Sequence, residues 1–156
     1  KEANALLNVL EKENTLTSNL KKLKSSLEKR KEISEKKINP SDLSSLIHQF
    51  KTNKSYQILE QILKDSTNND TDLLKFCEEG IALFPAQPFV YLVKGKILND
   101  QKNFQNALTT LKNGIDFVIV DEMEVDFYTE IAKAFKGLGN SKQEKKFKQK
   151  AKNLKN

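Results

Sequence analysis

The sequence has 156 residues, of which 37% are hydrophobic and 31% are charged, and its formal net charge is +6. This length is sufficient for one domain with a real core, and the composition is that of a soluble helical protein. No apolar run approaches the ~20 residues that a membrane-spanning helix needs, and a single cysteine excludes an internal disulfide. Because the chain begins with Lys1 rather than methionine, we expect a fragment or a processed form.

The first part of the chain is rich in leucine, but its organisation is ambiguous. Leu16, Leu20, Leu23 and Leu27 have the spacing of a short coiled-coil seam. A safe assignment would require about three to four heptads, and this run is shorter. The poor helix formers of the stretch NTLTSN predict a turn near residues 14–18 and two helices. One long helix over residues 1–38 is the alternative.

From residue 40 onwards, segments with helical spacing of apolar residues alternate with short polar turns. Ser41 follows Pro40 as an N-cap, and prolines at 85 and 88 end a later helix. We expect helices over residues 41–50, 56–65, 70–84, 89–100, 104–119, 120–137 and 141–154. With the N-terminal segments, this gives about eight or nine helices. No segment alternates with a period of two between turn signals, so we expect no sheet.

Two glycines stand where a helix interior would least favour them. Gly80 and Gly114 each precede an isoleucine in an apolar helical segment, and they are 34 residues apart. A glycine costs a helix about 1 kcal/mol relative to alanine, so packing must compensate. Helix pairs that repeat at this interval indicate stacked helical hairpins, in which two helices cross closely at a small residue. We expect leucine at either site to overpack the crossing, and alanine to be tolerated or stabilising.

The surrounding residues extend this repeat and resemble the tetratricopeptide repeat (TPR) family over residues 55–154. The matching positions are Gly80, Pro85, Tyr91, Gly95, Ala107, Gly114, Tyr128, Ala132, Gly139 and Ala151. The second unit begins 37 residues after the first, from Tyr91 to Tyr128, and departs from the pattern at Glu144 and Lys148. The string LFPAQPFVYLVKGKIL is also similar to TPR proteins of Bacteroidetes, many of which carry export signals.

This resemblance implies an all-α fold, a right-handed superhelical array of antiparallel helix pairs, or TPR-like α-solenoid. It divides the chain into N-terminal helices over residues 1–54 that match no repeat, and repeats over residues 55–156 with a C-terminal capping helix. The location stays open: periplasmic or envelope-associated if a signal segment was removed, and otherwise cytoplasmic.

In the family, the first helix of each repeat lines a concave groove that receives a peptide or a partner segment. The residues at those positions here are Phe89, Leu92, Lys96, Asn99, Thr129, Lys133 and Lys136. Lys96 and Lys133 are equivalent, and two stacked lysines could receive a carboxylate. The other positions of the family's carboxylate clamp do not match, and a solvated lysine pair is the alternative.

Residues with catalytic or metal-binding chemistry are sparse. His48 is the only histidine, and neither a second histidine nor a cysteine lies near it in the sequence. We interpret Cys77 as an inert packed thiol and the acids of residues 121–126 as favourable charges at a helix N-terminus. We therefore expect no enzyme, no cofactor and no metal site.

The leading hypothesis is thus a non-enzymatic scaffold for protein–protein interaction. A second hypothesis is a structural cap that ends a longer helical-repeat protein in an envelope assembly, because residues 140–156 hold seven lysines and one glutamate. A third, less favoured, is a basic nucleic-acid-binding helical protein. The lysines of this segment are interleaved by a single aromatic residue, and the chain has one arginine, so we expect no nucleic-acid partner.

Overall fold

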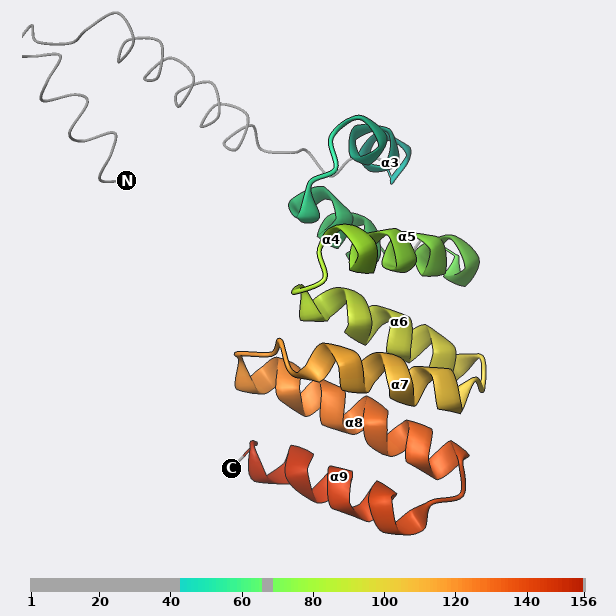
Figure 1. Cartoon of the computed structure of the whole chain (residues 1–156), viewed down its shortest axis with the longest axis vertical. Coiled ribbons are helices and arrows are strands. Elements are labelled where there is room, and N and C mark those ends of the chain that lie inside the picture. Colours follow the sequence, from blue (N-terminus) through green and yellow to red (C-terminus); the bar gives the residue numbers. More distant parts are fainter. Residues whose placement is uncertain (1–42, 66–68, 156) are drawn as a thin grey trace, which may run out of the picture. The chain divides into compact units, whose positions relative to one another are not determined.

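The computed structural model describes residues 43–65 and 69–155, which belong to a compact unit that spans residues 40–156. Within these ranges the chain is all-α, with seven helices and no strand (Figure 1). The helices are α3 (Leu43–Thr52), α4 (Tyr56–Lys64), α5 (Asp70–Leu83), α6 (Pro88–Asp100), α7 (Phe104–Ile115), α8 (Asp121–Gly137) and α9 (Ser141–Asn153). The leucine spacing near the N-terminus, and the choice between one helix and two over residues 1–38, lie outside the described residues.

The helices follow one another in chain order, and each packs against the next (Figure 1). Two further contacts skip one helix, because α4 packs on α6 and α6 packs on α8. Within the described ranges, α5, α7 and α9 do not approach one another in this way. The helix α3 lies before the boundary expected at residues 54 and 55, but it packs on α4 within the same compact unit. No described helix has both the length and the apolar character needed to cross a membrane.

The core lies where α6, α7 and α8 meet. Its buried members are Tyr91, Leu92, Leu98, Ala107, Leu108, Leu111, Phe127, Ile131, Ala134 and Phe135. Along α8, Phe127, Ile131 and Ala134 recur at intervals of four and three positions, so one apolar stripe of this helix faces α6 and α7. The Tyr91 hydroxyl donates a hydrogen bond of 2.9 Å to the Pro85 carbonyl, which ties the start of α6 to the loop that precedes it.

Gly80 lies where α5 contacts both α4 and α6. A methyl group added to Gly80 would lie 2.6 Å from Leu59 Cδ2 and 3.0 Å from Val90 Cγ1. The nearest of these atoms is the far end of a flexible leucine side chain, which can move. The close approach expected at this glycine is therefore present, and the leucine side chain nearest to it can move.

Gly114 holds the equivalent place on α7, but its surroundings are tighter. A methyl group there would lie 2.3 Å from Tyr91 Cβ, 2.6 Å from Tyr91 Cγ and 3.2 Å from Phe127 Cε1. The Tyr91 Cβ atom is bonded directly to the backbone of α6, so it can move only if that helix moves. The expectation that alanine would be tolerated at Gly114 is therefore wrong: even one methyl group overfills the crossing.

The helix expected over residues 104–119 is shorter in the structure. It ends at Ile115, and a hydrogen-bonded turn follows, in which Val118 N–H donates to the Ile115 carbonyl (3.1 Å). The turn lets Phe117 approach Tyr91, with ring centroids 6.1 Å apart. Apolar periodicity continues through this segment, but a run of β-branched residues is a weaker helix former than the sequence before it.

The helices α6 and α8 end in the same type of turn, 37 residues apart. The residue that follows each helix cap has a left-handed backbone, with φ of 61° at Lys102 and 73° at Gly139. In the first turn, Asn103 N–H donates to the Leu98 carbonyl (2.8 Å), and the matching bond in the second turn is 2.9 Å long. This bond pattern is the Schellman motif, which favours glycine at the left-handed position.

Replacing Lys102 with glycine is expected to raise the free energy of unfolding by about 0.5–1 kcal/mol, because lysine is strained in this conformation and glycine is not. Chemical denaturation followed by circular dichroism measures the change. Lys102→Ala is the matched control: it removes the same side chain but keeps the Cβ atom, so it should bring no gain. Equal stabilities of the two variants would contradict the argument.

Candidate functional site: the face of α4, α6 and α8

Side chains on α6 and α8 form two ion pairs across the contact between these helices. Lys133 Nζ lies 2.6 Å from Asp100 Oδ1, and Lys96 Nζ lies 3.8 Å from Asp126 Oδ2. All four side chains are well exposed, between 44% and 63%. The contact between α6 and α8 therefore places Lys96 and Lys133 on neighbouring helices, and each faces an aspartate of the other helix.

These two ion pairs contribute little to the stability of the fold, and one of them affects the pKa of Lys133. The hydrogen bond that Lys133 donates to Asp100 raises the pKa of Lys133 above its usual range. Exposed ion pairs of this kind contribute about 0–1 kcal/mol each, because water screens them and ordering two long side chains costs entropy. A carboxylate from a partner can therefore compete with either aspartate at small cost.

Asn99 connects the same two helices from a buried position. Its side chain is 2% exposed, and its Nδ2 donates to the Glu130 carbonyl (3.0 Å) and to Glu130 Oε2 (2.9 Å). Both acceptors are oxygens, which fixes the orientation of the amide. Asn99 was predicted to face a partner, but the structure assigns its amide group to holding α6 against α8.

Leu92 and Phe89 differ in exposure, although the sequence places both on the partner-binding side of α6. Leu92 is 2% exposed and belongs to the core, so it offers no surface to a partner. Phe89 is half-buried, and Lys64 Nζ of α4 lies 5.4 Å from the centre of its ring. Phe89 therefore remains an apolar contact on this face, next to a lysine that sequence reasoning did not include.

Thr129 and Lys136 are exposed on α8, and each lines a hollow. Lys136 lines one of about 400 Å³ at the ends of α6 and α8, together with Asn99, Lys102 and Lys133. Thr129 lines another of about 250 Å³ that α8 shares with α9. Its hydroxyl donates back to the Val125 carbonyl of its own helix (2.8 Å). Of the seven predicted residues, Phe89, Lys96, Lys133 and Lys136 therefore gather at the α4–α6–α8 face, and Thr129 lies at its edge.

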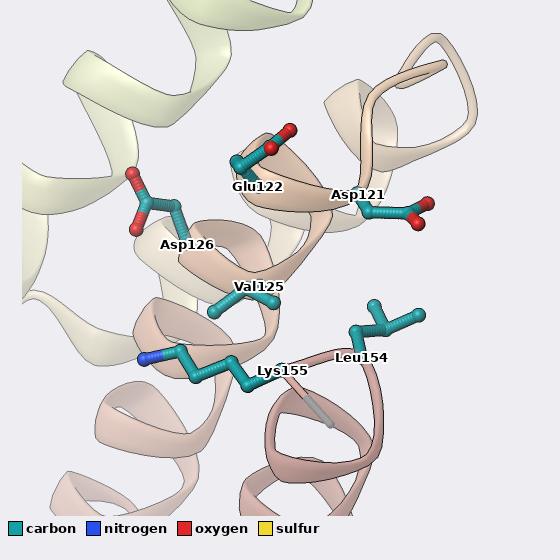
Figure 2. A pocket seen from close by; sticks show the side chains of 6 residues that line it. All are labelled: Asp121, Glu122, Val125, Asp126, Leu154 and Lys155. Carbon is teal, nitrogen blue, oxygen red and sulfur yellow. The ribbon is translucent and has the colours of Figure 1, made fainter.

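A third hollow, of about 480 Å³, lies beside the start of α8 and the residues that follow α9. Its acidic residues come from the stretch 121–126, and Figure 2 shows the side chains of Asp121, Glu122 and Asp126 pointing in different directions. No group of three or more acidic, histidine or cysteine side chains within the described residues is arranged to hold a metal ion. The acids instead stand in the first turns of α8, where the helix dipole favours negative charge.

The lone histidine and the lone cysteine lie apart from this face. His48 is exposed on α3. Cys77 is fully buried on α5, and burial raises the pKa of its thiol to about 12. A thiol that stays protonated is a poor nucleophile and a poor metal ligand. Neither residue therefore adds reactive chemistry to the candidate surface.

Sequence reasoning missed the partners of the lysines. Lys64, Asp100 and Glu130 became relevant only when the register between helices was known. The available signal was the spacing of 30 residues from Lys96 to Asp126 and of 33 from Asp100 to Lys133, which the repeat brings together.

No known protein family, no curated protein and no solved structure matches this chain in the comparisons made.

Proposed function

We propose that this chain is a non-enzymatic scaffold that binds a protein or peptide partner on the face formed by α4, α6 and α8. The observation that carries the proposal is the succession of contacts from α4 to α6 and from α6 to α8. It brings apolar and charged side chains of successive helices onto one surface. Phe89 is an apolar contact there, and Lys96 and Lys133 can exchange their aspartate partners for a carboxylate of the bound segment. An extended segment with apolar and acidic side chains fits this chemistry.

We further propose that residues 55–156 form a TPR-like α-solenoid. Two features recur at the intervals of the repeat and support this assignment. The glycines at 80 and 114 meet the helix before and the helix after their own, and the turns at 102 and 139 share one hydrogen-bond pattern. An array of this kind makes its surface from successive first helices, which are α4, α6 and α8 here.

The partner is sought by affinity capture with the full chain, and its dissociation constant is then measured for single variants. Phe89→Ala, Lys96→Ala and Lys133→Ala are each expected to weaken binding, by about 1.5–3 kcal/mol for a desolvated charge-assisted contact and by less than about 1 kcal/mol for an exposed one. The control is the double charge reversal Lys142→Glu with Lys146→Glu on α9, which should have little effect although it changes more charge. Loss of binding in the control variant, with Phe89→Ala and Lys96→Ala unaffected, would overturn the proposal.

A second candidate function, a structural cap that ends a helical array, is favoured by one comparison between helices. Cys77 of α5 and Leu111 of α7 are fully buried, whereas Lys148, in the same repeat position on α9, is 63% exposed. Lys148 Nζ lies 2.6 Å from Glu144, which replaces the buried Ala107. A charged outer face of this kind is what the end of an array needs to remain in water. The two functions are compatible.

A further inference from the structure

The side of α8 and α9 that no described helix covers corresponds, 37 residues later, to the surface of α6 and α7 on which α8 packs. We call a surface of two helices that receives a third helix a seat. The seat on α6 and α7 receives α8, and there the Phe127 ring lies against Gly114. Thirty-seven residues later, Ala151 on α9 takes the place of Gly114, and it is 7% exposed. A hollow of about 250 Å³ opens at this point. We call it the α8–α9 face; it is lined by Thr129, Ala132, Lys148, Ala151, Lys152 and Lys155.

The floor of this face is apolar, and a second hollow shares one of its lining residues. Ala132 is 1% exposed and lies where Gly95 lies in the preceding unit. The hollow of about 480 Å³ shares Lys155 with the first and adds Val125, which is buried, and Leu154, which is 36% exposed (Figure 2). Two small residues, Ala132 and Ala151, and two larger apolar ones, Val125 and Leu154, thus line the two hollows at the junction of α8 and α9.

The rim of the face carries charge where the earlier seat is apolar. Leu111, Ile115 and Val118 pack in or against the core that includes Phe127. Their equivalents are Lys148, Lys152 and Lys155, and all three are exposed. Glu144 partners Lys148, but residues 140–156 hold seven lysines against that one acid. Like the surface of α6 and α7, the α8–α9 face therefore has small residues at its floor, but it also has a basic edge along α9.

We propose that the α8–α9 face is a second interaction surface, which reversibly binds an acidic amphipathic helix of another protein. The apolar stripe of that helix would lie over Ala132 and Ala151, and its acidic edge would face Lys152 and Lys155. The inference goes beyond the scaffold function of the α4–α6–α8 face and does not depend on it. The occupant is a separate protein because a helix that is always present would favour an apolar seat like that of α8, whereas an intermittently empty seat must remain soluble.

The probe is a fluorescent peptide with the sequence of residues 121–137 in which Lys133 and Lys136 are replaced by glutamate. It copies the helix that α6 and α7 receive, and it is strongly acidic. Fluorescence anisotropy with the full chain is expected to show saturable binding. The double variant Lys152→Glu, Lys155→Glu should weaken it by about tenfold, since two exposed ion pairs are lost. The double variant Lys142→Glu, Lys146→Glu has the same net charge and should leave binding within about threefold of wild type.

Two further arms separate docking from general charge attraction. A peptide with Val125→Ser, Phe127→Ser and Ile131→Ser keeps every acid and should not bind. Vesicles of phosphatidylcholine and phosphatidylserine test a lipid surface as the alternative occupant. The proposal is overturned by absence of peptide binding, by equal effects of the two lysine pairs, by full binding of the serine peptide, or by binding of vesicles without binding of the peptide. Circular dichroism of each variant verifies that the substitutions leave the fold intact.

Discussion

Replacing Gly114 with alanine is expected to lower the free energy of unfolding by about 2–3 kcal/mol, near the upper end of the range for an overpacked core. The added methyl group would lie 2.3 Å from Tyr91 Cβ, closer than two non-bonded carbon atoms can approach. Either α7 or α6 must shift, and the shift loosens the contacts of Tyr91 with its neighbours in the core. The gain in helix propensity, about 1 kcal/mol, offsets only part of this cost. Chemical denaturation followed by circular dichroism measures the net loss.

Gly80→Ala is the matched control, because it adds the same methyl group at the equivalent position on α5. Its nearest neighbour is Leu59 Cδ2 at 2.6 Å, a terminal methyl group that can rotate away. The net change is therefore expected to lie within about 1 kcal/mol of zero, since a smaller steric cost meets the same gain in helix propensity. If both variants lose the same stability, the distinction between a movable and an immovable neighbour is incorrect.

The comparison of these two glycines indicates how far sequence reasoning reached. The interval of 34 residues identified both positions as close helix contacts, because only packing explains a repeated glycine in a helix. The sequence does not reveal which atom faces each glycine. That atom is a side-chain tip at one site and a Cβ atom at the other, and the difference decides whether alanine is tolerated.

The end of α7 is a similar case. Apolar spacing continued past Ile115, so the segment up to residue 119 was expected to be helical. In the structure, α7 stops at Ile115, and Ile119 is 95% exposed in the loop that leads to α8. Periodicity reports which residues are apolar, not whether a neighbouring helix is present to cover them. If α7 had continued as a helix, the side chains after Ile115 would have lain beyond the core. The loop begins at this point.

On the candidate face, the sequence identified the lysines more readily than their surroundings. Lys96 and Lys133 are exposed and lie on neighbouring helices. Leu92 and Asn99 stand three or four positions away on the same helix, yet both are buried. At 3.6 residues per turn, residues three or four positions apart differ by only about 40–60° in direction, so a small error in the assumed rotation exchanges contact residues for core residues. Only the register of α6 against α8 resolves them.

Removing residues 141–156, and with them α9, is expected to abolish cooperative thermal unfolding and to cause aggregation. The helix covers the side of α8 that carries Phe135, which is 8% exposed, and the ring of Phe147 stacks on Phe135 with centroids 5.5 Å apart. Tyr128 also contacts Phe147, at 5.7 Å between centroids. Deletion would expose this aromatic group on α8, and contiguous apolar surface of this kind promotes association. Light scattering and thermal circular dichroism measure both effects.

A point substitution tests the same contacts without shortening the chain. Phe147→Ser is expected to lower the free energy of unfolding by about 2–3 kcal/mol, less than for a fully buried phenylalanine because Phe147 is only partly buried. Phe147→Leu retains most of the apolar area and should lose about half as much, since it gives up the ring stacking. Deletion of residues 154–156 alone should have little effect, because Leu154 and Lys155 are exposed. If the chain that ends at Asn140 stays monomeric and melts sharply, α9 does not cap the core. The lysines of α9 must then have a role other than stabilising the fold.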